Sequence, residues 1–187
     1  MKESKKIMVF ALSGAITATT ATSLLAQPPA PPAPEVRAAM EKLAWLEGEW
    51  RGEGWRATSA GKETFQVSER THFHLDGLVL VVHGRGWSAD DEGNEIEGHK
   101  AFGVMSYDAF AKTYRFDAFV KDGYQSRSEP QVGENEYRWS HPAGPDAEMR
   151  YHAWLSEDGE WIESGERCIA DTCTPVMEMR LKRASSD

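Results

Sequence analysis

The chain has 187 residues, of which 40% are hydrophobic and 27% charged, and its formal net charge is −9. This length is enough for one domain with a sizeable buried core. The acidity argues against nucleic acid as a partner, because phosphate groups would be repelled and no local run of lysine and arginine offsets the charge.

The N-terminus predicts export. Three lysines precede a mostly apolar, threonine-rich run over residues 7–26, and this order is typical of a secretory signal peptide over residues 1–26. An uncleaved membrane anchor is the alternative, but serine, threonine and glycine residues dilute the run. Cleavage would remove three lysines and one glutamate and change the net charge from −9 to −11. We therefore expect a periplasmic or secreted protein with no stable membrane span.

Residues 27–34 form a proline-rich stretch, which predicts an extended spacer without a core of its own. In the segment that follows, Val36, Met40 and Leu43 recur at helical spacing. We expect a short helix that ends at Gly48 and closes one end of the domain.

From residue 49 onward the hydrophobic pattern has period 2 and is interrupted by turn residues. The pattern predicts one all-β domain over 35–185, a closed antiparallel up-and-down barrel with the short helix capping one end. A two-sheet sandwich is the alternative, but it needs long crossover connections, and the connections here have hairpin length. The expected strands are 49–58, 63–74, 78–87, 97–107, 113–121, 124–131, 135–141, 147–156, 160–169 and 174–183.

The two cysteines, Cys168 and Cys173, are separated by four residues. In an exported protein this spacing predicts a disulfide that clips a hairpin. A redox-active pair is the alternative, but the spacing is not Cys-x-x-Cys.

The strand expected over 63–74 presents an acidic residue to the interior. Alternation groups Glu69 with apolar residues on one face, where a carboxylate must be paired, hydrogen-bonded or protonated. An interior arginine–glutamate pair can orient the polar head of a ligand; the alternative is a carboxyl that meets water at a barrel mouth. We predict a ligand site with an aromatic lining, for which the candidate residues are Glu69, Arg85, Arg115, Arg138, Phe65, Phe102, Phe116 and Trp139.

The opposite face of the same strand carries His72 and His74, and His83 on the next strand could supply a third zinc ligand. Polar neighbours on this face favour a solvated surface instead, so we expect no metal site.

Two motifs carry a family resemblance. The sequence reads Leu-x-Gly-x-Trp-x-Gly-x-Gly over residues 46–54 and Gly-x-x-x-Tyr-Asp over residues 103–108. With the preceding helix and the strand meander, these motifs resemble the calycin superfamily, which includes lipocalins, fatty-acid-binding proteins and nitrobindins. They are most similar to the small exported lipocalin-like bacterial proteins of unknown function. The resemblance covers about residues 36–183 and implies a barrel that encloses a ligand.

The resemblance also implies a structural role for Trp50, packed at the closed end of the barrel against a cation of the final strand. Arg180 and Arg183 are the candidates for this cation–π contact, and ligand chemistry is expected on the opposite side of the interior. Nitrobindins hold haem through a histidine on their late strands, but the last histidine here is His152 and the final strand has none. We therefore expect no cofactor.

The chain lacks Gly-x-Ser-x-Gly, His-Glu-x-x-His and a glycine-rich phosphate loop, so we expect no catalytic residues. The expected function is non-catalytic binding of a small apolar or amphipathic molecule by a monomer or weak dimer. One alternative is an envelope interaction module whose aromatic side chains fill the barrel. The other is a barrel isomerase or cyclase, or a haem-binding protein.

Overall fold

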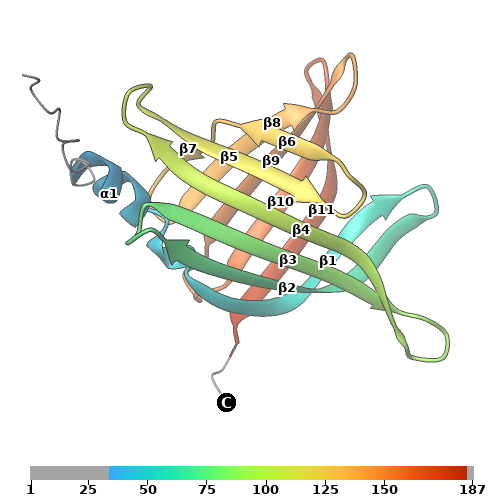
Figure 1. Ribbon diagram of the computed structural model, residues 1–187. Helices are drawn as coiled ribbons and strands as arrows, with labels where there is room; N and C mark the ends of the chain where they lie inside the picture. Colours follow the sequence, from blue (N-terminus) through green and yellow to red (C-terminus); the bar gives the residue numbers. More distant parts are fainter. Residues whose placement is uncertain (1–33, 185–187) are drawn as a thin grey trace, which may run out of the picture. The chain divides into compact units, whose positions relative to one another are not determined.

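Eleven antiparallel strands form one sheet in the computed structural model, which describes residues 34–184 (Figure 1). The predicted signal peptide, and the proline-rich spacer up to residue 33, lie outside the described residues. The elements are α1 (Pro34–Glu41), η1 (Ala44–Leu46), β1 (Gly48–Thr58), β2 (Gly61–His74), β3 (Val79–Ala89), β4 (Glu95–Asp108), β5 (Thr113–Val120), β6 (Gln125–Ser128), β7 (Gln131–Val132), β8 (Glu136–Pro142), β9 (Ala147–Leu155), β10 (Trp161–Ile169) and β11 (Thr172–Arg183).

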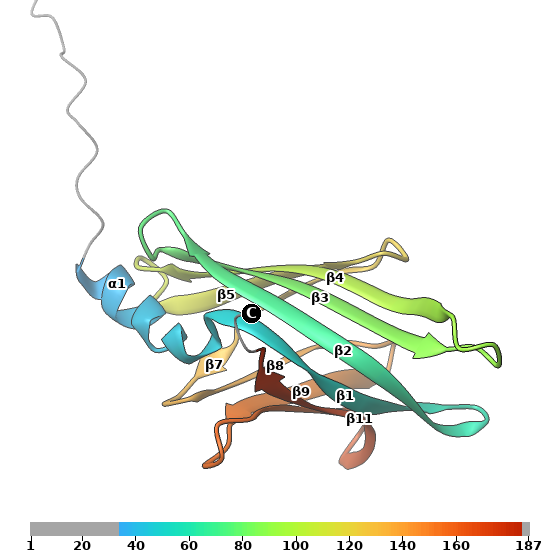
Figure 2. The ribbon, with the colours of Figure 1, turned by 90° about the horizontal axis from the view of Figure 1, so that it is seen from below.

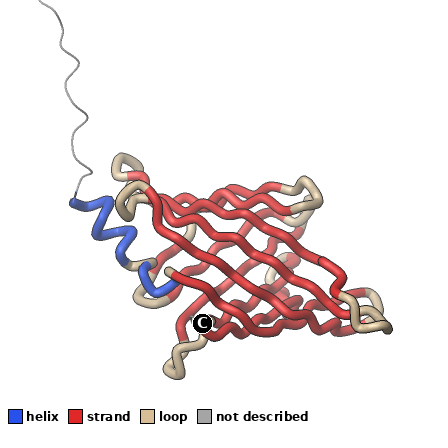
Figure 3. The backbone as a smooth tube through the Cα atoms, turned by 60° about the horizontal axis from the view of Figure 1, so that its bottom comes forward, coloured by secondary structure: helices blue, strands red, loops and turns tan. Residues whose placement is uncertain are grey.

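The sheet is a meander whose first and last strands pair with each other. Its order is β6-β5-β4-β3-β2-β1-β11-β10-β9-β8-β7, and the β1–β11 ladder joins the two halves. The sheet curls, so that β2–β5 form one wall and β8–β11 the facing wall, as seen from below in Figure 2 and in the backbone tube of Figure 3. All-β architecture is therefore confirmed, and the interior lies between these walls.

The prediction of one strand over 124–131 was wrong. The chain makes β6 and β7 instead, separated by Glu129 and Pro130, and β6 pairs with β5 whereas β7 pairs with β8. Proline has no backbone N–H to donate, so it suits a point where the ladder breaks. Although β6 approaches β8, no ladder joins these edges in the described chain. The structure is therefore a curled half-barrel sheet. The closure into a full barrel that the sequence predicted is not shown by a strand ladder.

The expected helix is present but shorter than predicted. α1 ends at Glu41, and hydrogen bonds from Leu43 N to Met40 O and from Leu46 N to Leu43 O, each 3.0 Å, tighten the chain into η1 before Gly48. This tightening buries Met40, Leu43 and Leu46 completely. The helix lies at one end of the sheet (Figure 2), where the Tyr114 hydroxyl of β5 donates a hydrogen bond of 2.7 Å to Ala39 O.

Trp50 is fully buried beside η1. Its indole Nε1 donates to Leu46 O at 2.8 Å, and its ring meets Trp161 edge to face with centroids 5.8 Å apart. Thr71 of β2 also donates to Leu46 O. One carbonyl of η1 thus anchors β1 and β2 together at this end of the interior.

Arg183 is the cation that packs on Trp50, with its Cζ atom 4.3 Å from the ring centroid. Its guanidinium also donates to Glu47 O at 2.5 Å and to Trp45 O at 2.9 Å. Arg180, the other predicted candidate, instead forms an exposed ion pair with Glu178. The cation predicted for Trp50 therefore comes from the last residue of β11.

Replacing Arg183 with lysine is expected to lower the free energy of unfolding by about 1–2 kcal/mol, because lysine keeps the charge but loses the planar fork that reaches two carbonyls. Urea unfolding followed by tryptophan fluorescence measures this. Arg180→Lys is the matched control and should cost less than about 0.5 kcal/mol, since its ion pairs are exposed. Equal losses in the two variants would contradict a role for the Arg183 fork.

Cys168 and Cys173 form a disulfide between β10 and β11, where they are direct cross-strand partners. The predicted hairpin clip is confirmed, and neither of the two described cysteines is free in this structure. Within residues 34–184, no helix is both long and apolar enough to cross a bilayer.

Candidate functional site

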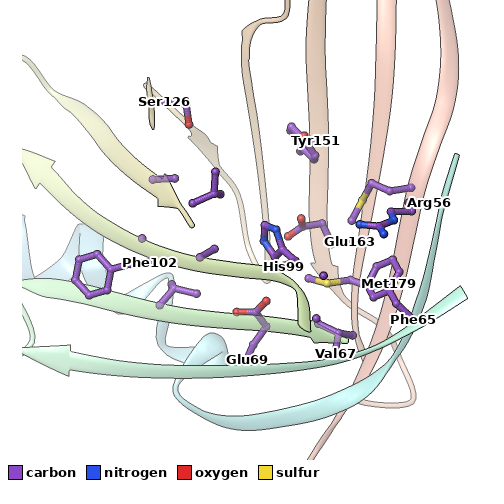
Figure 4. Close-up of a pocket in the computed structure, with 18 of the residues that line it drawn as sticks. Arg56, Phe65, Val67, Glu69, His99, Phe102, Ser126, Tyr151, Glu163 and Met179 are labelled. Carbon is purple, nitrogen blue, oxygen red and sulfur yellow. The ribbon is translucent and has the colours of Figure 1, made fainter. Parts of the chain in front are cut away.

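A cavity of about 420 Å³ lies between the two walls of the sheet. Its lining comes from strands on both sides, and Figure 4 shows the side chains that border it. Representative lining residues are Glu69, Phe116, Trp139, Tyr151, Glu163 and Met179. The interior of this domain is therefore not completely filled by its aromatic side chains.

Two glutamates from different walls border the cavity. Glu69 lies on β2 and is the cross-strand partner of Trp50 and Gly84, whereas Glu163 lies on β10 between Ala153 and Met179. Because Glu69 is directly beside Trp50, the expectation that site chemistry lies across the interior from Trp50 was wrong for this residue. The two carboxyl groups approach the same space from β2 and β10 (Figure 4).

Gly84 makes room for one of these carboxyls. A Cβ atom at this position would lie 2.7 Å from Glu69 Oε1 and 2.9 Å from Oε2, which is closer than van der Waals contact allows. The absence of a side chain on β3 thus lets the Glu69 carboxyl lie against the wall of the cavity.

Both carboxyl groups are surrounded by protein except where they face the cavity. Burial raises the pKa of Glu163 from an ordinary value of 4.5 to about 8. Burial, and after it the negative charge of Glu163, raise the pKa of Glu69 from 4.5 to about 8 as well. Removal from water disfavours the charged form of an acid. At neutral pH both groups are therefore largely protonated in the ligand-free protein.

None of the predicted arginine partners pairs with Glu69. Arg85 forms ion pairs with Glu95 and Glu97, Arg115 with Asp108 and Glu129, and Arg138 with Glu136. Adjacent residues of a strand point to opposite faces, so Arg115 and Arg138 point away from the interior that their neighbours Phe116 and Trp139 border. Arg138 instead lines a second, separate hollow of about 350 Å³ together with Arg150 and His152.

Within residues 34–184, neither Glu69 nor Glu163 has a hydrogen-bonding or ionic partner from another side chain. Among the described residues of the cavity lining, Arg56 is the one arginine or lysine, and it is held by two hydrogen bonds of 3.1 Å to Glu63. Partial burial and the positive charge of Arg56 lower the pKa of His99, another lining residue, so that this imidazole is neutral at pH 7.

The wall formed by β8 and β9 carries a stack of aromatic rings. The ring of Trp139 is stacked between Tyr137, at a centroid distance of 5.3 Å, and Tyr151, at 4.5 Å. Phe116 of β5 meets Trp139 edge to face at 5.6 Å. These contacts fix the ring positions and give the cavity a rigid apolar side.

The predicted aromatic lining is largely found at the cavity. Phe65, Phe116 and Trp139 border it. Phe102 also belongs to the lining, but its ring is 40% exposed and packs edge to face on His83, with centroids 5.0 Å apart. Its strand partners His83 and Phe119 place it on the outer face.

The histidines of β2 lie on the outer face, as their alternation with Glu69 predicts. His72 is exposed, and its Nδ1 lies 3.3 Å from Glu47 Oε1. Among the described residues, the group with metal-ligand spacing is Glu166 with the two cysteines, and those sulfurs are already bonded to each other.

The sequence prediction missed many of the lining residues, among them Tyr137, Tyr151 and Glu163. The signal for Glu163 was present, because it alternates in phase with Trp161 on the strand predicted over 160–169. The tyrosines alternate in phase with Trp139 and with Ala153, respectively. What was missing was the knowledge of which face of these strands points inward.

The hydroxyl of Tyr137 makes no hydrogen bond to a described residue, although the side chain is only 3% exposed. Burial first, and then the charges of Glu163 and Glu69, raise the pKa of Tyr137 well above its usual range. By contrast, Tyr114 is 9% exposed and its hydroxyl is bonded to Ala39 O.

Tyr137→Phe should therefore change the free energy of unfolding of the ligand-free protein by less than about 0.5 kcal/mol, whereas Tyr114→Phe should lower it by about 1–2 kcal/mol. Urea unfolding of both variants provides the comparison. A loss for Tyr137→Phe as large as that for Tyr114→Phe would show that the cavity hydroxyl has a tight partner.

Comparison with known proteins adds no identity to this geometry: no family model matches the chain, and no curated protein matches it significantly.

Proposed function

We propose that this protein is an exported carrier or sensor that binds a small hydrophobic or amphipathic molecule inside its curled sheet. The observation that carries the proposal is the cavity of about 420 Å³ with rigid aromatic walls and polar groups directed into it. Ligand sites for small molecules have volumes of about 300–1,000 Å³ and combine apolar lining with a few polar groups. Export is supported by the disulfide, which persists in oxidising compartments.

The packing of Arg183 on Trp50 supports the resemblance to calycins, and we propose membership of that superfamily on this contact together with the meander order. The filled-core interaction module is the weaker candidate, because the same cavity would have no purpose in it.

The test is native mass spectrometry of the full-length protein purified from its own host, followed by denaturation and analysis of the released compounds. We expect a reproducible mass above that of the bare chain. Bare protein in every preparation, with no thermal shift from fatty acids, haem or flavonoids, would contradict ligand binding.

An isomerase acting on an enclosed substrate is a second candidate, favoured by one observation. The pKa values of Glu69 and Glu163 are raised to about 8, and an acid–base catalyst works best when its pKa is near the working pH. Incubation of the recovered ligand with the protein in D₂O distinguishes the two functions. Deuterium incorporation that is lost in Glu163→Gln indicates proton transfer, whereas an unchanged ligand indicates binding alone.

A further inference from the structure

Two acidic groups face the cavity without a cation from the protein. The titratable or charged side chains that share the lining are Arg56 and Glu63, already bonded to each other, and His99, His141, Tyr137 and Tyr151. No lysine contributes to this lining. The charge that would balance ionised Glu69 and Glu163 is thus missing from the described chain.

A second observation points to an occupant. The Tyr137 side chain lines the cavity and is 3% exposed, and its hydroxyl makes no hydrogen bond to a described residue. Buried polar groups are normally satisfied, so two carboxyl groups and a phenol that border one cavity without a side-chain partner among the described residues indicate a site that is completed by a bound molecule.

We propose that the ligand carries a protonated nitrogen, which the carboxylates of Glu69 and Glu163 balance, while its apolar part lies against the aromatic wall of β8 and β9. The inference rests on the proposed function, since it assigns a chemical class to the ligand of the same cavity. Hydrogen bonds between an ammonium group and a carboxylate are charge-assisted and stronger than neutral ones. A ligand carboxylate would meet two acids and no free cation.

The proton balance of binding separates an amine from a neutral ligand. Near pH 7 the ligand-free carboxyls hold protons, so an ammonium ion that binds as an ion pair must displace at least part of a proton into solvent. Its affinity should then rise with pH up to about pH 8. A neutral hydrogen-bond acceptor would instead accept a hydrogen bond from the protonated carboxyl, and its affinity should fall as the pH rises above about 8. The sign of the pH dependence is thus diagnostic.

The experiment compares three head groups on two scaffolds by isothermal titration calorimetry of the full protein stripped of endogenous ligand. The aromatic series is tryptamine, tryptophol and indole-3-propanoate, and the aliphatic series is octylamine, octanol and octanoate. We expect the amine of at least one scaffold to bind at least tenfold more tightly than its alcohol. Proton release in buffers of different ionisation enthalpy should accompany amine binding.

Glutamine variants test the two carboxyls. Glu69→Gln and Glu163→Gln keep the shape of the side chain, so we expect amine affinity to fall by about tenfold to a hundredfold and alcohol affinity to change little. Glu53→Gln is the matched control, because Glu53 is exposed on β1 and lies outside the cavity lining; it should bind amines as the wild type does.

Gly84→Ala tests the position of the Glu69 carboxyl. The added Cβ meets only the flexible end of Glu69, so the variant should fold and yet bind amines at least threefold more weakly. Gly98→Ala is its control, since the nearest atom to a Cβ there is Arg56 Nη2 at 3.6 Å, an ordinary contact, and Gly98 also lines the cavity.

The outcomes separate the two proposals. An alcohol or carboxylate that binds as tightly as its amine, or glutamine variants that bind amines unchanged, overturns the amine inference while ligand binding stands. If no probe binds, the compound released from host-purified protein decides, and one without a basic nitrogen also overturns the inference. The absence of both probe binding and a released compound defeats the proposed function itself.

Discussion

Raising the pH from 5.5 to 8.5 is expected to lower the free energy of unfolding of the ligand-free protein by about 1–3 kcal/mol for each of the two interior glutamates. In the unfolded chain Glu69 and Glu163 have ordinary pKa values of 4.5, whereas in the folded protein both pKa values are raised to about 8. The folded state therefore binds more protons than the unfolded state between these two values. Stability is fully present below the lower value and is lost as the pH rises through the upper one.

The range of magnitudes follows from the site. The full pKa difference would correspond to about 5 kcal/mol per carboxyl, of which the interval from pH 5.5 to 8.5 covers about 3 kcal/mol, and water in the cavity reduces this amount further. The carboxyls with lowered pKa values, such as Asp108 and Glu136, contribute stability that is lost only as the pH falls through the acidic range. His99, with its lowered pKa, acts in the opposite direction below about pH 6.5 and is present in every variant compared.

The measurement is urea unfolding at several pH values for the wild type and for the double variant of Glu69→Gln with Glu163→Gln. The difference in stability between them should grow with pH, because glutamine cannot ionise. Glu53→Gln should follow the wild type at every pH. Parallel curves for the wild type and the double variant would contradict the assignment of two protonated interior acids.

Strand alternation was the most reliable sequence signal. It correctly placed Glu69 with Phe65 on the inner face of β2 and the histidines on the outer face, because a residue's face follows directly from its position in the strand. The burial of Trp50 agrees with the role that the resemblance to calycins implied for it, which alternation alone did not predict. To identify which arginine packs on Trp50, one must know the pairing register of β11. The sequence does not give this register and left two arginines, three residues apart, as candidates.

The arginines illustrate a contradiction within the sequence prediction. Arg115 directly precedes Phe116 in β5, and Arg138 directly precedes Trp139 in β8, so neither pair could face the cavity together. Arg85 misses Glu69 for a different reason. The acidic hairpin after β3 supplies Glu95 and Glu97 as exposed ion-pair partners. Local charge pairs across a hairpin could have been inferred from sequence separation alone.

The features of the candidate site that escaped prediction depend on contacts between distant strands. Glu163 is 94 residues from Glu69 in the chain, and only the curl of the sheet brings β2 and β10 to one space (Figure 4). The break between β6 and β7 has a visible cause in Pro130, but whether the edges nevertheless pair depends on the whole sheet. Cavity volume likewise depends on packing and has no local sequence signal.

A phenylalanine at Ala118 is expected to abolish ligand binding, with at least a tenfold loss of affinity, while the domain stays folded. Ala118 borders the cavity from β5, and its cross-strand partners Gly103 and Ser126 are small. A phenyl ring can therefore enter the space that a ligand would occupy. Burial of the ring favours folding and any overpacking opposes it, so we expect the free energy of unfolding to change by less than about 2 kcal/mol.

The affinity of Ala118→Phe is measured with the compound recovered from host-purified protein or with the probe amine that binds most tightly. Ala57→Phe is the matched control, because Ala57 is an exposed residue of β1. Because neither substitution alters Glu69 or Glu163, the variant also separates volume from charge. If Ala118→Phe loses affinity while its stability still falls at high pH, then ligand binding depends on the volume of the cavity. The loss of stability at high pH depends on the ionisation of the two acids in the same cavity. Unchanged affinity would instead place the ligand outside this cavity, and the second hollow, which Glu129 and Glu166 line together with Arg138 and Arg150, would be the next candidate.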